Sequence, residues 1–350
     1  MIRIGILGFA HGHINAIAAQ WQEHPELGVQ IVCGWDHDAA RLQQHCEKFG
    51  IAACESVQQL LESDIEAVAI TSETSLHAEL AETAAAAKKN IILYKPMALT
   101  MEQADRIVRA VEENGVRFTM AWQMRTDPQN QLMRSMIREE KLGKTCLYRR
   151  RHALPTHIWP DFENAWHASP VYNRDIFADD SSHPFDMMQW IFGMPETVSC
   201  EMSTMVNPKI PNDNAVALFR YADGMIAEIT CSFTCSASEI TTEVYCTEGT
   251  IQQYFGDNPA TRLPRVEKMP GLKWFREGDA DWTDSGIPSP ASHGARLGWQ
   301  AAPLAEFLAG GPEICTVQEG RNSLRLVLAC YVSAREGRRV SVNDPKIYDI

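Results

Sequence analysis

Two short stretches, far apart in the sequence, carry the side chains best suited to chemistry. The first is Tyr94-Lys95-Pro96, which closes a predicted strand, and the second runs from Asp179 to His183 and opens a predicted helix. Together they supply a lysine, a carboxylate and a histidine, a combination that suits removal of a proton from an alcohol. Taken singly, Lys95 also fits a solvated strand end, and Asp179 or Asp180 fits a helix N-cap, so the joint occurrence carries the interpretation.

The position of His183 supports a role as a general base. It precedes Pro184 at the expected start of a helix that ends near Gly193. Proline is favoured in the first turn of a helix, and the positive end of the helix disfavours a protonated imidazole. A neutral imidazole is what a general base needs. Asp186 and Trp190, which lie inside the same helix, are interpreted as structural.

A glycine-containing loop follows the first predicted strand. The strand runs from Ile2 to Leu7, the loop is Gly8-Phe9-Ala10-His11-Gly12-His13, and a helix is predicted from Ile14 to Trp21. Gly8 can supply the tight turn that directs the N-terminus of this helix at a pyrophosphate. Ala10 stands where the dinucleotide-binding fingerprint has its second glycine, so the match is imperfect and an ordinary βα turn is the alternative.

Asp36 strengthens the interpretation of a dinucleotide site. It ends the second predicted strand, at about the separation expected of the acid that binds the adenosine ribose. A carboxylate there repels a 2′-phosphate, so NAD is favoured over NADP. The alternative role, capping the helix that begins near Ala39, suits Asp38 better. His11 and His13 do not converge on a metal ion without further ligands, so we predict no metal site.

The pattern of apolar residues predicts two domains. As far as Trp122, short apolar runs alternate with segments of helix-forming residues such as 75–89 and 100–113, which indicates a parallel sheet covered on both faces. Beyond it, long strand-like runs are joined by the hairpin signals Ala222-Asp223-Gly224 and Glu248-Gly249. We predict an α/β Rossmann domain over 1–122 and an α+β domain over 123–350, with a large, mostly antiparallel open sheet and late helices near 299–308 and 321–335.

Composition excludes several classes of protein. The chain has 350 residues, 45% of them apolar, and a formal net charge of -13, which argues against binding of nucleic acid. No apolar run is long enough to span a bilayer. The N-terminus enters a strand almost at once, with no secretory signal, so the ten cysteines favour a reducing cytoplasm over disulfides.

The motifs together resemble the Gfo/Idh/MocA oxidoreductases, a family named for glucose-fructose oxidoreductase and inositol dehydrogenase. The resemblance covers nearly the whole chain, and its carriers are Gly8 with Asp36, Ser75-Leu76-His77, Lys95-Pro96-Met97-Ala98-Leu99-Thr100, Asp179 with His183, and Glu248-Gly249-Thr250. It implies a Rossmann domain followed by a substrate domain with an open sheet, and a homodimer or homotetramer. It also implies that Lys95 binds the reacting hydroxyl near the nicotinamide, that His183 is the base, and that Asp179 orients it or holds a neighbouring substrate hydroxyl.

The same resemblance points to the residues that contact the cofactor and the substrate. Expected cofactor contacts are Gly8, Phe9, Ala10, His11, Gly12, His13, Asp36, Thr71, Ser72, His77, Tyr94 and Lys95. Candidate substrate residues are Arg125, His152, His157, Trp159, Trp166 and Arg174, since tryptophan faces stack on sugar rings, although they are equally common in protein cores.

Four departures from the family pattern fall around these positions. Tyr94 replaces a glutamate, Ser181 replaces a glycine, and Asn173-Arg174-Asp175 replaces a glycine-rich run. The loop Thr71-Ser72-Glu73-Thr74 lacks the frequent proline and presents a carboxylate instead. We expect the substrate to be selected here.

The sequence therefore predicts an NAD(P)-dependent dehydrogenase that oxidises a secondary alcohol of a sugar or cyclic polyol, or reduces the matching ketone. Two alternatives stay open at this point. One is an NAD-dependent glycosidase that acts by transient oxidation and elimination, without net turnover of the cofactor. The other is a non-catalytic regulator that senses the nucleotide, against which the intact lysine and histidine positions argue.

Overall fold

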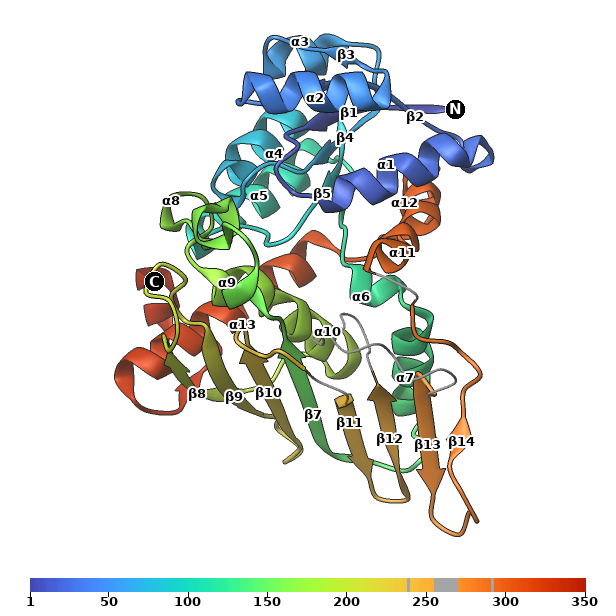
Figure 1. Ribbon diagram of the computed structural model, residues 1–350, viewed down its shortest axis with the longest axis vertical. Helices are drawn as coiled ribbons and strands as arrows, with labels where there is room; N and C mark the ends of the chain where they lie inside the picture. The colour runs from blue at the N-terminus through green and yellow to red at the C-terminus, as the bar shows by residue number, and fades with distance from the viewer. Residues whose placement is uncertain (238–239, 255–269, 291–292) are drawn as a thin grey trace. The chain divides into compact units, whose positions relative to one another are not determined.

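A computed structural model of the protein describes residues 1–237, 240–254, 270–290 and 293–350. These residues form two compact units, each built around its own sheet (Figure 1). Unit 1 comprises Met1–Gln123, Val171–Asn173 and Gly294–Leu324, and unit 2 comprises the described parts of Met124–Pro170, Arg174–His293 and Arg325–Ile350. Both units are thus discontinuous in sequence, whereas the boundary predicted at residues 122 and 123 divides the chain once.

Unit 1 contains a parallel sheet of six strands in the order β3-β2-β1-β4-β5-β6. The strands are β1 (Ile2–Leu7), β2 (Val29–Trp35), β3 (Ala52–Ala53), β4 (Ala67–Ile70), β5 (Asn90–Leu93) and β6 (Phe118–Met120). The helices among them are α1 (His13–Glu23), α2 (Ala39–Phe49), α3 (Val57–Glu62), α4 (His77–Ala86) and α5 (Met101–Asn114), with 3₁₀ turns at Pro25–Leu27 and Thr74–Leu76. From β1 the next strands are added on one side as far as β3, and from β4 onward they are added on the other side. Sheets of this kind bind ligands at such a switch point, here between β1 and β4.

Local sequence explains these elements. All four residues of β4 are buried, as a central parallel strand with helices on both faces requires. Helix α5 begins after Thr100, whose hydroxyl accepts a hydrogen bond from the backbone N–H of Gln103 at 3.3 Å, and ends at Gly115 in the left-handed conformation. The parallel strands place their carboxyl ends at one edge of the sheet, so the loops that carry Gly8, Asp36, Thr71 and Lys95 all begin at that edge.

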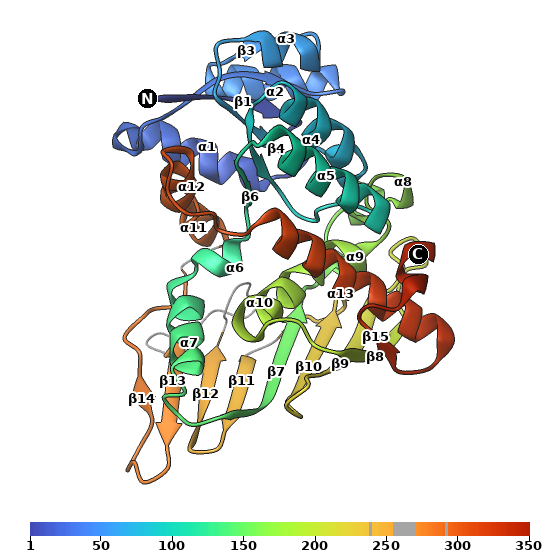
Figure 2. The same cartoon turned by 180° about the vertical axis from the view of Figure 1, so that it is seen from behind.

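Helices α11 (His293–Gly298) and α12 (Ala301–Leu308) lie late in the sequence, and α12 belongs to unit 1. It packs beside α1, as both views show (Figures 1 and 2). The indole of Trp21 donates a hydrogen bond to the Ala301 carbonyl at 2.9 Å, and Leu304 and Phe307 join the buried cluster around Ile4. The sequence pattern predicts α12 but assigns it to the second domain. Periodicity shows that a helix has an apolar face, but it does not show which part of the protein that face packs against.

Unit 2 contains nine strands among the described residues, in the order β14-β13-β12-β11-β7-β10-β9-β8-β15. They are β7 (Thr145–Ala153), β8 (Thr197–Ser203), β9 (Asn214–Arg220), β10 (Ile226–Ser232), β11 (Ile240–Cys246), β12 (Gly249–Tyr254), β13 (Leu272–Arg276), β14 (Thr283–Asp284) and β15 (Val340–Ser341). Only the β7 and β10 pair is parallel among these described neighbours; the others are antiparallel. This arrangement and the Rossmann sheet confirm the predicted fold class.

The remaining helices are α6 (Gln123–Thr126), α7 (Pro128–Arg138), α8 (Pro170–Asn173), α9 (Ile176–Asp180), α10 (Ser182–Phe192) and α13 (Val317–Glu336), with 3₁₀ turns at Thr156–Ile158, Phe162–Asn164, Trp166–Ala168 and Pro345–Asp349. Of these, α7, α9 and α10 lie wholly in unit 2, whereas α6, α8 and α13 contain residues of both units. Helix α10 packs on one face of the sheet, where Phe185 meets Phe219 of β9 at 5.2 Å between ring centroids. Strand β9 alternates buried and exposed residues accordingly, with Val216 and Leu218 on the exposed face. Within the described part of the chain, no helix has the length and hydropathy of a bilayer-spanning segment.

Candidate cofactor and catalytic sites

Gly8 is the position of the first loop that requires glycine. Its φ is +83°, in the left-handed region, and a Cβ there would lie 2.5 Å from the Cα of Ser72. The loop is held on both sides: the Gly8 N–H donates to the Trp35 carbonyl at 2.7 Å, and the Thr71 hydroxyl donates to the Gly8 carbonyl. The loop after β1 is therefore clamped between the ends of β2 and β4.

The start of α1 borders open space at Gly12, while its first N–H group, that of His13, lies 3.5 Å from Nδ1 of His11. Gly12 is the N-cap residue of this helix, makes no side-chain cap, and would have no heavy atom within 4 Å of an added Cβ. The N–H groups of a helix N-terminus attract anions such as a pyrophosphate. Ala10 occupies the position of the second fingerprint glycine and is half-buried. The open space in this loop lies two residues later, at Gly12, just before the helix begins at His13.

Phe9 contributes its backbone to the site and its ring to the core. The ring is buried, stacks on His45 at 4.8 Å, and fills the space where a Cβ on Gly34 would come within 2.5 Å. Its N–H donates to Oδ2 of Asp36 at 2.7 Å. The ring of Phe9 is therefore part of the buried core of unit 1.

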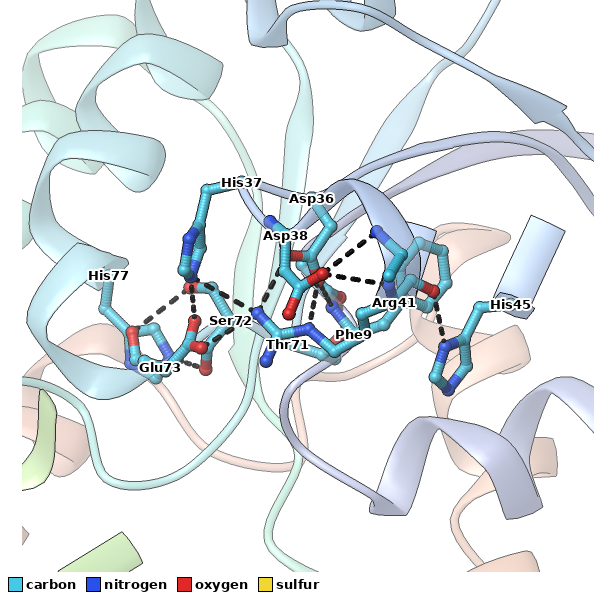
Figure 3. Close-up of polar contacts among 12 residues, drawn as sticks. Phe9, Asp36, His37, Asp38, Arg41, His45, Thr71, Ser72, Glu73 and His77 are labelled. Atoms are coloured by element: carbon cyan, nitrogen blue, oxygen red, sulfur yellow. Dashed lines mark hydrogen bonds and ion pairs between the residues drawn. The ribbon is translucent and has the colours of Figure 1, made fainter. Parts of the chain in front are cut away.

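Asp36 lies at the centre of a network of polar contacts (Figure 3). Oδ1 accepts hydrogen bonds from the Asp38 N–H at 2.8 Å and from Nη2 of Arg41 at 2.7 Å. Oδ2 accepts from the Phe9 N–H and from Nε of Arg41, each at 2.7 Å. The side chain is fully buried, so Arg41 holds it as a bidentate ion pair. The helix cap is Asp38, as expected, which accepts from the N–H groups of Ala40 and Arg41.

A second carboxylate, from the loop after β4, completes the network. Oε1 of Glu73 accepts a hydrogen bond from Nη2 of Arg41 at 2.8 Å, and Oε2 lies 3.0 Å from Nε2 of His37 (Figure 3). Burial disfavours the charged guanidinium, but its hydrogen bonds to Asp36 and Glu73 outweigh this cost and raise the pKa of Arg41 above its ordinary value. Arg41 is the cation that joins two buried carboxylates.

His77 connects the loop after β4 to the loop after β5. Its Nδ1 lies 2.8 Å from the Pro96 carbonyl and its Nε2 lies 3.2 Å from the Ser72 carbonyl. Complete burial lowers the pKa of His77, an effect that the hydrogen bonds to the two carbonyls partly offset. His77 is thus placed to position the segment that contains Lys95.

Tyr94 and Lys95 follow β5 and are both buried, with 0% and 3% of their surface exposed. The Tyr94 ring lies 5.5 Å from that of His11 and 6.5 Å from that of His13, measured between centroids. Burial raises the pKa of Tyr94 well above its usual value, so its hydroxyl stays protonated. The residue that replaces a family glutamate is therefore a neutral hydroxyl beside the cofactor loop.

In unit 2, three buried side chains from β7, α9 and α10 lie together. Oδ2 of Asp180 is 2.8 Å from Nε2 of His152, and Oδ1 is 3.7 Å from Nε2 of His183. His183 lies in the first turn of α10, which begins and ends where the sequence predicts. Neither Asp179 nor Asp180 caps this helix, because both belong to α9 and the N-cap is Ser181. The carboxylate measured beside His183 is that of Asp180.

Asp179 points to a different histidine. Its Oδ2 lies 2.8 Å from Nδ1 of His167, whose ring stacks on Trp166 at 3.9 Å between centroids. Asp179 is buried, whereas a quarter of the His167 side chain is exposed. The structure thus brings the predicted residues Asp179 and Trp166 together through His167.

The other candidate substrate residues are spread over unit 2. Arg125 makes a buried bidentate ion pair with Asp186, with both N–O distances at 2.8 Å. Arg174 donates to the carbonyl of Ile350 at 2.8 Å, and Nδ1 of His157 lies 3.3 Å from the Phe233 carbonyl. Trp159 is 41% exposed. His152 is the predicted pocket residue that lies 2.8 Å from the Asp180 carboxylate beside His183.

Three residues of these networks are missing from the sequence prediction, namely Arg41, His37 and His167. Arg41 had a signal: an arginine in the first turn of a helix, five residues after the predicted ribose-binding acid, lies on the same side of the helix start. His37 and His167 had none, because Glu73 lies 36 residues from His37, and His167 lies in a short 3₁₀ turn whose side-chain directions no periodicity predicts. Among the described residues, no three His, Cys, Asp or Glu side chains are arranged to hold a metal ion. All ten cysteines are in the described ranges and are free thiols.

Comparison with known proteins agrees with this geometry. Residues 2–122 match the family described as "Oxidoreductase family, NAD-binding Rossmann fold", and residues 130–252 match "GFO/IDH/MocA C-terminal domain". The chain belongs to the Gfo/Idh/MocA oxidoreductase family. The predicted resemblance is thereby confirmed, and membership makes this protein an NAD(P)-dependent oxidoreductase.

Members of the family with assigned names are similar over much of the chain. The 1,5-anhydro-D-fructose reductase of Ensifer adhaerens is 27% identical over 273 residues, which are 75% of this chain and 78% of the relative. The D-apiose dehydrogenase of Paraburkholderia graminis is 25% identical over 364 residues, which are 97% of this chain and 88% of the relative. A solved structure of levoglucosan dehydrogenase with NADH and levoglucosan has a TM-score of 0.84 at 19% identity, covering 98% of this chain and all of that one. That likeness shows the shared fold.

Proposed function

We propose that this protein is an NAD-dependent dehydrogenase that transfers a hydride between the nicotinamide and a secondary alcohol or ketone of a sugar or cyclic polyol. The observation that carries the proposal is the buried Asp180 and His183 pair on α9 and α10, together with a clamped glycine loop at the end of β1. The pair supplies a base with a carboxylate to stabilise its protonated form, and the loop supplies a place for a pyrophosphate.

The residues at the end of the unit 1 sheet fit a dinucleotide. The glycine loop and the uncapped start of α1 would hold the pyrophosphate, and Asp36 would face the adenosine ribose. Two carboxylates and one arginine leave this end of the site with an excess negative charge, which disfavours a 2′-phosphate. We therefore propose NAD as the preferred cofactor.

The protein side chains carry the proton chemistry. When bound, the nicotinamide supplies the acceptor for a hydride from the carbinol carbon. Lys95 binds the reacting hydroxyl, and one of the ring nitrogens of His183, Nε2 or Nδ1, accepts the proton of that hydroxyl. Loss of the proton raises the electron density on the substrate oxygen, which drives departure of the hydride from the carbinol carbon. Two opposing effects act on His183: at a buried position a helix N-terminus disfavours the imidazolium by at most about 2 kcal/mol, whereas a carboxylate at 3.7 Å favours it by about 4 kcal/mol at an effective dielectric constant of about 20. Asp180 therefore stabilises the imidazolium that forms during the reaction.

The proposed substrate class follows from the pocket residues and the relatives. Asp179, His167 and Trp166 place a carboxylate, an imidazole and an aromatic face side by side, a combination that suits neighbouring hydroxyls and the apolar face of a sugar ring. The names of the two relatives, a reductase of 1,5-anhydro-D-fructose and a dehydrogenase of D-apiose, favour a carbohydrate.

Two further assignments accompany the proposal. Val216, Leu218 and Ile226 form an exposed apolar group on β9 and β10, which fits a homodimer or homotetramer assembled through the open sheet. Free cysteines fit a reducing compartment such as the cytoplasm. Light scattering of the purified protein tests the first assignment, and a monomer would contradict it.

The test of the function is turnover of the cofactor. We would follow nicotinamide absorbance with NAD and with NADP against D-apiose, levoglucosan, myo-inositol and D-glucose, and in the reverse direction against 1,5-anhydro-D-fructose. Lys95→Ala and His183→Ala are expected to lose at least about a hundredfold in kcat/KM. Full turnover in both variants would refute the site assignment. Release of sugar from a glycoside without net change in absorbance would instead identify the alternative NAD-dependent glycosidase.

A further inference from the structure

Asp36 has no free hydrogen-bonding capacity in this structure. A carboxylate offers about four acceptor positions, and here they are taken by the N–H groups of Phe9 and Asp38 and by two nitrogens of Arg41. A ribose diol that binds Asp36 must therefore displace the guanidinium from at least one oxygen. Arg41 therefore determines whether Asp36, the acid that the family pattern assigns to the ribose, has an oxygen available to bind it.

Arg41 also cancels the charge on which the selectivity argument depends. A single buried aspartate repels a 2′-phosphate, but an aspartate in a bidentate pair with arginine has no net charge. A guanidinium is moreover well suited to bind phosphate bidentately. Asp36 with Arg41 alone would form a site that tolerates NADP.

Glu73 changes this balance. Its side chain is 3% exposed and accepts from the same Nη2 of Arg41 that contacts Asp36, so the three groups sum to one negative charge. Glu73 also holds the guanidinium of Arg41 from a second side through a hydrogen bond between charged groups. Such a bond is about twice as strong as one between neutral groups. The loop that carries Glu73 is fixed by its neighbour, because the Thr74 hydroxyl donates to Asn173 at 2.7 Å.

We propose that Glu73 determines the coenzyme selectivity of this enzyme: it restores the negative charge that Arg41 cancels on Asp36 and keeps the guanidinium from a 2′-phosphate. The proposal rests on the proposed function, whose NAD preference it explains through a residue outside the ribose-binding strand end. His37 contacts both Glu73 and Arg41, so all variants are compared at one fixed pH.

The experiment measures the dissociation constants of NADH and NADPH by nicotinamide fluorescence, which requires no turnover. Glu73→Gln keeps the size of the side chain and a carbonyl acceptor for Arg41 but removes the charge. We expect NADPH to bind about tenfold more tightly to this variant, while the affinity for NADH changes less than about threefold. Thermal melting confirms that the variant is folded.

Two further variants separate this mechanism from a general charge effect. Arg41→Ala in the Glu73→Gln background is expected to abolish the gain in NADPH affinity, because the guanidinium is the group that the 2′-phosphate binds. Asp38→Asn removes one negative charge from the same strand end. Because the Asp38 side chain accepts hydrogen bonds from the backbone N–H groups of Ala40 and Arg41 rather than from the guanidinium, this variant should give less than a third of the gain.

Three results would overturn the proposal: an unchanged ratio of the two dissociation constants in Glu73→Gln, an equal gain in Asp38→Asn, or a gain that survives the loss of Arg41. The proposed function fails separately, when NADH binds to the wild type but no sugar or polyol is oxidised or reduced. In that event a shifted ratio in Glu73→Gln still supports the role of Glu73.

Discussion

Replacement of Asp180 by asparagine removes a buried negative charge without changing the size of the side chain. Oδ1 of Asp180 lies 3.7 Å from Nε2 of His183, and the two side chains are 12% and 4% exposed. With an effective dielectric constant of about 20, opposite unit charges at this distance attract each other by about 4 kcal/mol. The second oxygen of Asp180 is engaged with His152 at 2.8 Å, so His183 receives only part of this attraction.

We therefore expect Asp180→Asn to cost about half of that value, ~2 kcal/mol, in the transition state in which His183 becomes an imidazolium. This corresponds to about a thirtyfold loss in kcat/KM. Without the carboxylate, His183 gives up its proton more readily, so the acidic limb of the pH profile should move to lower pH while the maximum rate falls.

The assay is the initial rate of nicotinamide reduction between about pH 5 and pH 9, with the best substrate of the panel. Asp179→Asn is the matched control, because it removes the neighbouring charge, which contacts His167. This control should raise KM, since Asp179 is proposed to hold a substrate hydroxyl, and should leave the acidic limb in place. An acidic limb that moves in Asp179→Asn and stays fixed in Asp180→Asn would refute the reasoning.

Three other changes test how the sites are held. Gly8→Ala forces a Cβ into Ser72 at positive φ and should lower the free energy of unfolding by about 3 kcal/mol, measured with urea, and weaken NADH binding. Arg125→Met leaves the Asp186 carboxylate buried without its ion pair and should cost about 3 to 5 kcal/mol, part of which the additional change Asp186→Leu restores. Burial lowers the pKa of His77 from its ordinary 6.5, so below that pH the unfolded chain takes up a proton that the folded protein does not. The stability of the protein therefore falls as the pH drops below about 6.5. The melting temperature of His77→Gln should depend less on pH than that of the wild type between about pH 7.5 and 5.5.

The alternation of apolar runs and helix formers was sufficient to predict the parallel sheet of the Rossmann unit, although not its two-residue strand β3 or the short helix α3. Short-range chemistry explains this success: Thr100 and Gly115 bound α5, and the buried run of β4 requires helices on both faces. The partner of α12 could not be predicted in the same way, because its apolar stripe fits either unit until Trp21 and Ala301 are seen in contact.

The candidate sites show the same division between local and distant information. The sequence places Asp179 and Asp180 next to each other, but only the fold of α9 shows that Asp180 lies beside His183 and Asp179 beside His167. Asp36 was identified from its distance to the glycine loop. Its ion pair with Arg41 is local in sequence, but the bridge from Arg41 to Glu73 joins residues 32 positions apart, and no spacing rule predicts such a contact.

The central claim is that this protein transfers a hydride from a carbinol carbon to NAD. The most direct measurement incubates the enzyme and NAD with C-deuterated D-glucose and C-deuterated myo-inositol, and determines by mass spectrometry whether the reduced cofactor carries deuterium. We expect one deuterium per molecule of NADH formed, and loss of this transfer in His183→Ala. Recovery of unlabelled, unreduced NAD from every substrate of the panel, with the protein folded and NADH bound, would contradict the account.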